Sequence, residues 1–279
     1  MKHLLRFELA KTFNPKRSAV SFLLVAAFVA MILLGLWLQE RRHRQVKVEG
    51  KTFSEYMNAP MCTVIAQMPA LFLFLPIMAA IAGASQVASE SQSGTLRTMM
   101  IRPVSRTSVV LTKFLALGVY MFALTAMMGV LTFALGWAWF GKLGDLLVSK
   151  EMLGLGRGFV ILPADVVIAR IVFSYLLAVI SLWSLASIGL LCGIALDQTA
   201  GAAMAVLGLY FISYIIDAVP FFSELHRFLP TRNWNWWSRV YDSDIQWHEL
   251  LRRGLWIGAY TLACLGLSVG LFLRKDIRS

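Results

Sequence analysis

The chain alternates between long apolar runs and short polar segments. Six runs of 19 or more residues contain no charged side chain. A helix of about 20 apolar residues is needed to cross the hydrocarbon core of a bilayer, and a charge at its centre is costly. The sequence therefore predicts six transmembrane helices, at residues 18–38, 61–84, 114–140, 171–196, 198–216 and 254–273.

The segments around these runs complete the predicted fold. Residues 1–14 place Leu5, Leu9 and Phe13 on one helical stripe beside basic residues, which is typical of a helix lying in the membrane interface. Little more than Asp197 separates the fourth and fifth runs, which indicates a tight helical hairpin. We predict an all-α membrane protein whose residues 1–279 form a single transmembrane domain.

Composition supports lipid as the surrounding medium. Charged residues make up 15% of the chain, whereas soluble domains usually have about 25%. The net charge of +11 comes from residues that flank the apolar runs, so anionic lipids are the expected partner and nucleic acid is not. The three cysteines and four histidines show no spacing typical of a disulfide framework or a metal site.

One string imitates a nucleotide-binding motif. GWAWFGKL at 136–143 fits the first part of a phosphate-binding loop, but Leu143 stands where that loop needs a hydroxyl, and the string ends a membrane run. We interpret the match as chance and expect no ATPase site and no other enzyme activity in this chain.

Charge does not decide the orientation. If the spans alternate and the N-terminus is inside, the inner side has 12 Lys and Arg and the outer side has 14. Most tryptophans, including Trp234, Trp236 and Trp237, fall towards one side and are predicted to form an aromatic belt at that interface. Lys113 and Arg170, at span ends, are expected to reach lipid headgroups.

Two polar segments stand out. Residues 217–253 form the longest loop, in which apolar residues at helical spacing predict an amphipathic helix ending at Pro230: Phe221, Phe222, Leu225, Phe228 and Leu229. Residues 89–106, SESQSGTLRTMMIRPVSR, lie between the second and third spans. There Leu96, Met99 and Met100 share one face of a helix about two turns long, which Pro103 ends. Such a helix is too short to be stable alone, so it either docks against a partner or is a solvated turn.

The same segment carries a resemblance to a known family. Glu90-xxx-Gly94-Thr95-Leu96, then Pro103-Val104-Ser105-Arg106 and Lys113, resembles the first cytoplasmic loop of ABC-2 type transporter permeases, compact six-span subunits with a separate ATPase. The layout of the whole chain is similar too. Residues 39–60 depart from it, being unusually basic for an outer loop of the family.

The resemblance implies a function, a topology and a set of partners. Two copies of a cytoplasmic ATPase, which would bind ATP and magnesium, would pair with this permease and a second, identical or different, permease chain to form an exporter. The termini would be cytoplasmic in a prokaryotic cell membrane, and residues 85–106 would be the coupling loop, with its helix at 95–101. The residues implied in coupling are Glu90, Gly94, Thr95, Leu96, Arg97, Met99, Met100, Pro103, Val104, Ser105 and Arg106, and the helix at 217–230 would be the outer gate.

Two other functions remain open from the residues alone. The chain could be a secondary transporter, although its charge-free spans lack the deep acidic residue that a proton-coupled transporter needs. It could also be a membrane scaffold that recruits a partner through residues 89–106.

Overall fold

The computed structural model describes residues 2–42, 47–48, 51–52, 57–96, 105–141, 143–219, 221, 224, 226 and 229–275. Helices dominate these residues, and six of them are long and apolar enough to cross a membrane. The elements are α1 (Lys2–Thr12), α2 (Pro15–Arg42), β1 (Lys47–Val48), β2 (Lys51–Thr52), α4 (Ala59–Pro69), η1 (Ala70–Phe74), α5 (Leu75–Gln92), α7 (Arg106–Phe140), β3 (Leu146–Ser149), β4 (Phe159–Leu162), α8 (Ala164–Leu196), α9 (Thr199–Ala218), α10 (Pro230–Trp234), η4 (Asn235–Tyr241) and α11 (Trp247–Arg274). The predicted fold class and six spans are confirmed.

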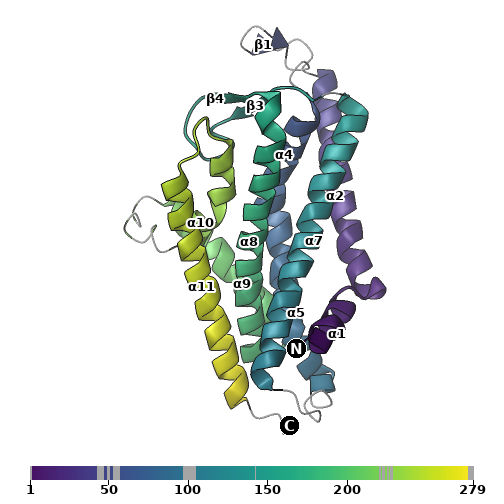
Figure 1. Ribbon diagram of the computed structural model, residues 1–279, viewed down its shortest axis with the longest axis vertical. Coiled ribbons are helices and arrows are strands. Elements are labelled where there is room, and N and C mark those ends of the chain that lie inside the picture. The colour runs from purple at the N-terminus through teal and green to yellow at the C-terminus, as the bar shows by residue number, and fades with distance from the viewer. Residues whose placement is uncertain are drawn as a thin grey trace.

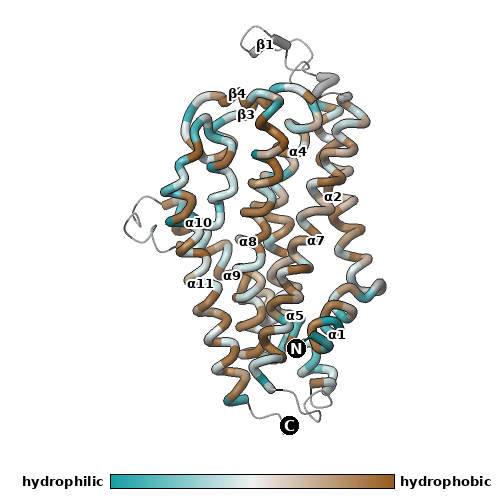
Figure 2. Tube along the Cα trace, in the orientation of Figure 1, coloured by the Kyte–Doolittle hydropathy of each residue, from teal (hydrophilic) through white to brown (hydrophobic). Residues whose placement is uncertain are grey.

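The helices run roughly side by side in an elongated bundle (Figure 1). α1 and the last turn of α11 lie at one end, here named the termini end. The antiparallel β3–β4 hairpin lies at the opposite end, here named the hairpin end. Apolar residues extend along the helices, and hydrophilic residues gather in α1 and at the two ends (Figure 2). This distribution fits a bundle whose middle is surrounded by lipid.

The second predicted span is longer than the sequence suggested. The α4–η1–α5 helix runs from Ala59 to Gln92, because polar residues beyond 84 continue the helix and two of them, Gln86 and Glu90, are buried within the chain. Its middle turn, η1, is a π-helix that follows Pro69. Such turns are rare and occur frequently at functional sites.

Close packing of α5 against α8 forms the centre of the bundle. A Cβ atom added to Gly83 would lie 2.2 Å from the carbonyl oxygen of Ala186, and one added to Gly193 would lie 2.5 Å from that of Ala84. The small residues therefore allow the two helix backbones to approach. Gly189 and Gly193, four residues apart on α8, therefore serve packing within the chain.

The turn between α8 and α9 is as short as predicted. Asp197 caps α8 in a left-handed conformation, with φ at 52°, and α9 begins at Thr199. The two helices form an antiparallel hairpin whose turn lies at the termini end.

Candidate functional site

The described flanks of the 97–104 segment leave the bundle at the termini end. α5 continues to Gln92, and Gly94 follows with φ at 68°, a conformation that glycine adopts without strain. The hydroxyls of Ser93 and Thr95 lie 2.9 Å apart, and both contact the carbonyl oxygen of Glu90. Thr95 is exposed, whereas Leu96 is 3% exposed and packs into the chain's own core.

After the loop the chain re-enters the bundle at α7, and hydrogen bonds hold the first residues of this helix in place. Ser105 is the N-cap of α7 and accepts a hydrogen bond from the backbone amide of Ser108. Arg106 donates to three carbonyl oxygens at the end of α11, those of Phe272 at 3.2 Å, Leu273 at 3.1 Å and Lys275 at 2.8 Å. The guanidinium satisfies acceptors that a helix end leaves unpaired. It thereby fixes the start of α7 to the end of the last helix.

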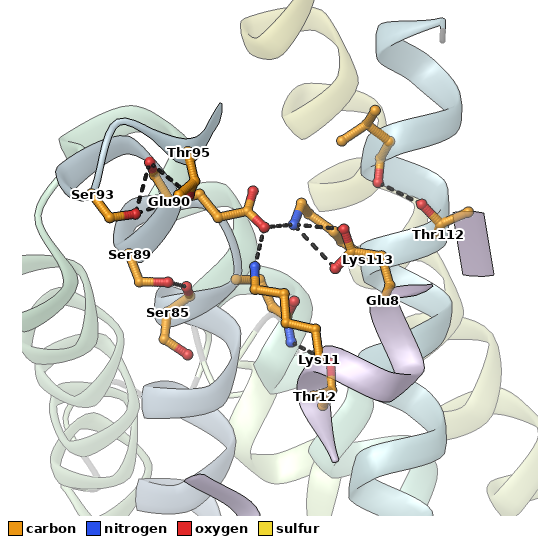
Figure 3. Close-up of polar contacts among 12 residues, drawn as sticks. Glu8, Lys11, Thr12, Ser85, Ser89, Glu90, Ser93, Thr95, Thr112 and Lys113 are labelled. Atoms are coloured by element: carbon orange, nitrogen blue, oxygen red, sulfur yellow. Dashed lines mark hydrogen bonds and ion pairs between the residues drawn. The ribbon is translucent and has the colours of Figure 1, made fainter. Parts of the chain in front are cut away.

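A cluster of four charged side chains lies beside these flanks (Figure 3). Glu8 and Lys11 come from α1, Glu90 from the last turn of α5, and Lys113 from the second turn of α7. The Lys113 ammonium donates to Glu90 at 2.6 Å and to both oxygens of Glu8 at 3.1 and 3.2 Å. Lys11 forms a further ion pair with Glu90.

Burial makes this cluster costly to disrupt. Glu8 and Lys113 are fully buried and Glu90 is 2% exposed, while Lys11 is 30% exposed. Two carboxylates and two ammonium groups make the cluster neutral, which is the arrangement that a buried charge requires. The cluster therefore locks α1, the end of α5 and the start of α7 together.

A second set of contacts connects the loop flanks to the α8–α9 turn. Lys275 forms an ion pair with Asp197 and donates to the carbonyl oxygen of Ile194 at 2.6 Å. Burial raises the pKa of Asp197, but the hydrogen bonds from Lys275 and Ser91 outweigh it, so the pKa lies below its ordinary value. The hydroxyl of Thr199 donates to Gln92 at 3.0 Å. The helix ends around the loop are thus joined to one another.

The structure brings several predicted coupling residues together. Glu90 lies in the last turn of α5, with Gly94, Thr95 and Leu96 just after it, and Ser105 and Arg106 begin α7. The ion pair of Glu90 with Lys113 of α7 places these two groups at the same end of the bundle. Arg97, Met99, Met100, Pro103 and Val104 lie outside the described residues. The roles of these residues in coupling stay predictions.

Sequence reasoning missed Glu8 and Lys11 and misplaced Lys113. The prediction that Lys113 reaches the headgroups is wrong, because two carboxylates hold its ammonium inside the chain. One signal was present: Glu8 is the only carboxylate before residue 40, and it lies on a helix otherwise rich in basic residues. An isolated acid in such a segment indicates a buried pairing.

The segment proposed as an outer gate differs from its predicted form. Among the five apolar residues, Phe222, Leu225 and Phe228 lie outside the described residues, while Phe221 is 86% exposed and Leu229 is the N-cap of α10. Pro230 begins a helix instead of ending one, because proline fits the first turn, where its missing amide hydrogen is not needed. Whether these residues form a gate stays a prediction.

After Pro230 the chain turns back into the bundle. α10 and η4 pack against α8, α9 and α11, and Trp234, Trp236 and Trp237 are buried there. The Trp236 indole donates to the Ser181 hydroxyl at 2.9 Å. These three tryptophans therefore do not belong to the predicted aromatic belt, whereas Trp137 and Trp139 remain exposed near the hairpin end.

Buried hydrogen bonds hold this returning segment in place. Gln67 donates to Ser174 at 2.9 Å and accepts from the Tyr241 hydroxyl at 2.7 Å, and Ser174 in turn donates to the carbonyl oxygen of Trp237. Arg170 donates to the carbonyl oxygens of Val240, at 2.7 Å, and of Asp242 and Ser243. The prediction that Arg170 reaches the headgroups is wrong, because its guanidinium binds the backbone carbonyl oxygens at the end of η4.

Two other predicted features can be placed. Within the part of the chain that the structure describes, no group of three His, Cys, Asp or Glu residues could hold a metal ion. Residues 136–140 of the GxxxxGK string are the end of helix α7, where a phosphate loop would have a strand and an open turn.

Comparison with models of known protein families identifies a match. A family model described as ABC-2 family transporter protein matches residues 4–222. The matched range includes residues 4–12 of α1, the charged cluster and both flanks of the loop. No curated protein sequence matches the chain.

Proposed function

We propose, because the chain belongs to the ABC-2 transporter family, that it is the permease subunit of an exporter driven by a separate ATPase. Family membership and the six membrane-capable helices make it a multi-pass membrane transport component. The direction of transport, the coupling to an ATPase and the composition of the assembly are the proposed parts.

The loop at the termini end is the proposed point of coupling. A cytoplasmic ATPase, present in two copies and binding ATP and magnesium itself, would seat residues 95–101 in a surface cleft. A second permease chain, identical or different, would complete the membrane part. The resemblance of residues 90–113 to the coupling loop of the family supports this assignment.

One observation carries the proposal. Both flanks of the loop are bound to a neutral, buried ion-pair cluster that also includes α1. A push on the loop therefore acts at once on α5, α7 and α1, because separating them would leave charges buried without partners. Arg106 extends the connection to the end of α11. The loop is thus connected to helices that cross the membrane.

The proposal also fixes the topology. The termini end would face the cytoplasm of a prokaryotic cell and the hairpin end the outside. In a variant without native cysteines, Thr95→Cys should be protected from a membrane-impermeant maleimide added to intact cells. Asp244→Cys, an exposed position beside the hairpin end, should be labelled. The opposite labelling pattern would contradict the proposed orientation.

ATPase association is tested by co-purification. The chain, tagged and expressed in its native host, should retain an ATPase subunit after solubilisation in detergent. Thr95→Trp should abolish this retention, because Thr95 is exposed on the loop and a bulky ring would prevent seating in a cleft. Arg97→Glu, which reverses a charge implied in coupling, should have the same effect.

The matched control is Ser243→Trp, which places the same ring at an exposed position near the hairpin end. It should retain the ATPase. If the wild-type chain retains no ATPase, or if both loop variants retain it as the control does, the coupling assignment is wrong. The elution volume in size-exclusion chromatography verifies that each variant is folded.

A further inference from the structure

A cavity of about 410 Å³ opens near the hairpin end. Its walls come from four places: the α4–η1 junction, the turn between β3 and β4, α9 and η4. Three aromatic residues line it, Phe72, Tyr214 and Trp237. Among the described lining residues Glu151 is the one with a charged side chain.

The aromatic wall is held in place by internal contacts. The Tyr214 hydroxyl donates to the side-chain oxygen of Asn235 at 3.1 Å. The rings of Phe72 and Tyr214 pack edge to face, with 4.8 Å between their centroids. The Tyr210 hydroxyl donates to the carbonyl oxygen of Phe72 at 2.9 Å. A ligand would therefore meet rings that are already positioned, which reduces the entropy lost on binding.

The π-helix supplies an independent indication of function. Phe72 lies in the middle of η1 and is 50% exposed. A π turn inside a longer helix rotates the following side chains and frees carbonyl oxygens, here those that accept from Tyr210. This irregular turn coincides with the cavity wall.

We propose that this cavity binds an organic cation, a quaternary ammonium or protonated amine that carries an apolar substituent. Aromatic rings attract a cation through their negative faces, and aromatic cages are a known means of recognising quaternary ammonium groups. The Glu151 carboxylate adds the complementary charge, and the thioethers of Met68 and Met152 offer adaptable apolar contacts.

A role of this cavity in transport rests on the proposed function of the chain as a permease. The cavity would be the place where a cationic amphiphile is held before its release at the hairpin end. Binding itself requires no ATPase. It can therefore be measured on the full chain alone in lipid nanodiscs, so that a failure here is distinct from a failure of ATPase coupling.

The test compares benzyltrimethylammonium with its neutral carbon isostere, neopentylbenzene, by equilibrium dialysis. The cation should bind more tightly than the isostere. Glu151→Gln should weaken cation binding about two- to five-fold, and Phe72→Leu should weaken it about three- to ten-fold. Binding of the isostere should change little in Glu151→Gln.

The matched control is Asp165→Asn, which removes an exposed carboxylate near the hairpin end but outside the cavity. It should bind the cation as the wild type does. Added salt should weaken cation binding to the wild type more than to Glu151→Gln. Equal binding of the two probes, an unchanged affinity in Glu151→Gln, or an equal loss in Asp165→Asn would each overturn the proposal.

Discussion

Lys113 gives the sharpest test of the buried cluster. Its ammonium is fully buried and contacts Glu90 at 2.6 Å and Glu8 at 3.1 Å. At an effective dielectric constant of about 20, each contact near 3 Å has a gross attraction of about 5 kcal/mol, which the loss of hydration largely offsets. Lys113→Met keeps the volume of the stem but leaves two buried carboxylates with one remaining cation.

The free energy of unfolding should fall by about 3–5 kcal/mol in Lys113→Met, as when one partner of a buried pair is removed. Lys11→Met is the matched comparison, since Lys11 is 30% exposed and its pair with Glu90 is partly screened by solvent. Its loss should be about 1 kcal/mol. Reversible unfolding of the purified chain in mixed micelles, titrated with SDS, measures both values.

A further variant separates charge from packing. Glu8→Gln, Glu90→Gln and Lys113→Met combined contain no buried unpaired charge and should recover most of the stability lost in Lys113→Met. The reasoning is refuted if Lys113→Met costs less than about 1 kcal/mol. It is also refuted if Lys11→Met costs as much as Lys113→Met.

Three more predictions concern other parts of the bundle. Gly83→Ala should lower the free energy of unfolding by about 1–3 kcal/mol or more, because the added Cβ would collide with the backbone of Ala186. The control is Gly208→Ala, where an added Cβ meets open space. In the same SDS titration it should leave the free energy of unfolding unchanged or raise it. Tyr241→Phe should cost about 1–3 kcal/mol, because it removes the hydroxyl that binds buried Gln67, and an unchanged unfolding curve would contradict this. Burial raises the pKa of Asp242, but the hydrogen bond and charge of Lys150, together with the hydrogen bonds from Ser243, outweigh burial and place the pKa below 3.8. The resulting stability should be present above pH 3.8 and be lost as the pH falls through the lower pKa of the folded state. Lys150→Met should reduce that loss, and thermal unfolding of both chains across this pH range would show no difference if the pair contributes nothing.

The spans could be predicted because they depend on local composition. A charge-free run long enough to cross a bilayer has few other structures available, so all six were found. The turn at Asp197 was predictable for the same reason, since two such runs with almost nothing between them must fold back on each other. The end of α5 was not, because Glu90 looks polar enough for a loop and is buried in a helix only through its distant partners Lys11 and Lys113.

Features that depend on distant residues escaped prediction. Glu8 and Lys113 are 105 positions apart, and no local pattern pairs them. The tryptophans of residues 234–237 have the composition of an interfacial belt, and the indole that reaches Ser181 reveals their burial only in three dimensions. The π turn at Ala70–Phe74 follows Pro69, but a proline in a membrane helix predicts a kink without its form. Much of the loop motif lies outside the described residues, and its coupling role stays a prediction.

The pairing of Glu8 with Lys113 also sets an order of assembly. During synthesis α1, α2 and α5 leave the ribosome before α7, and until Lys113 arrives the carboxylates of Glu8 and Glu90 outnumber the one cation, Lys11, that is present to neutralise them. Burying them at that stage would be unfavourable, so we expect α1 to remain at the membrane surface and to dock only after the third span has inserted. A docked α1 therefore indicates that the first half of the bundle is complete, and a chain stopped before α7 leaves a charged, undocked helix accessible to membrane proteases.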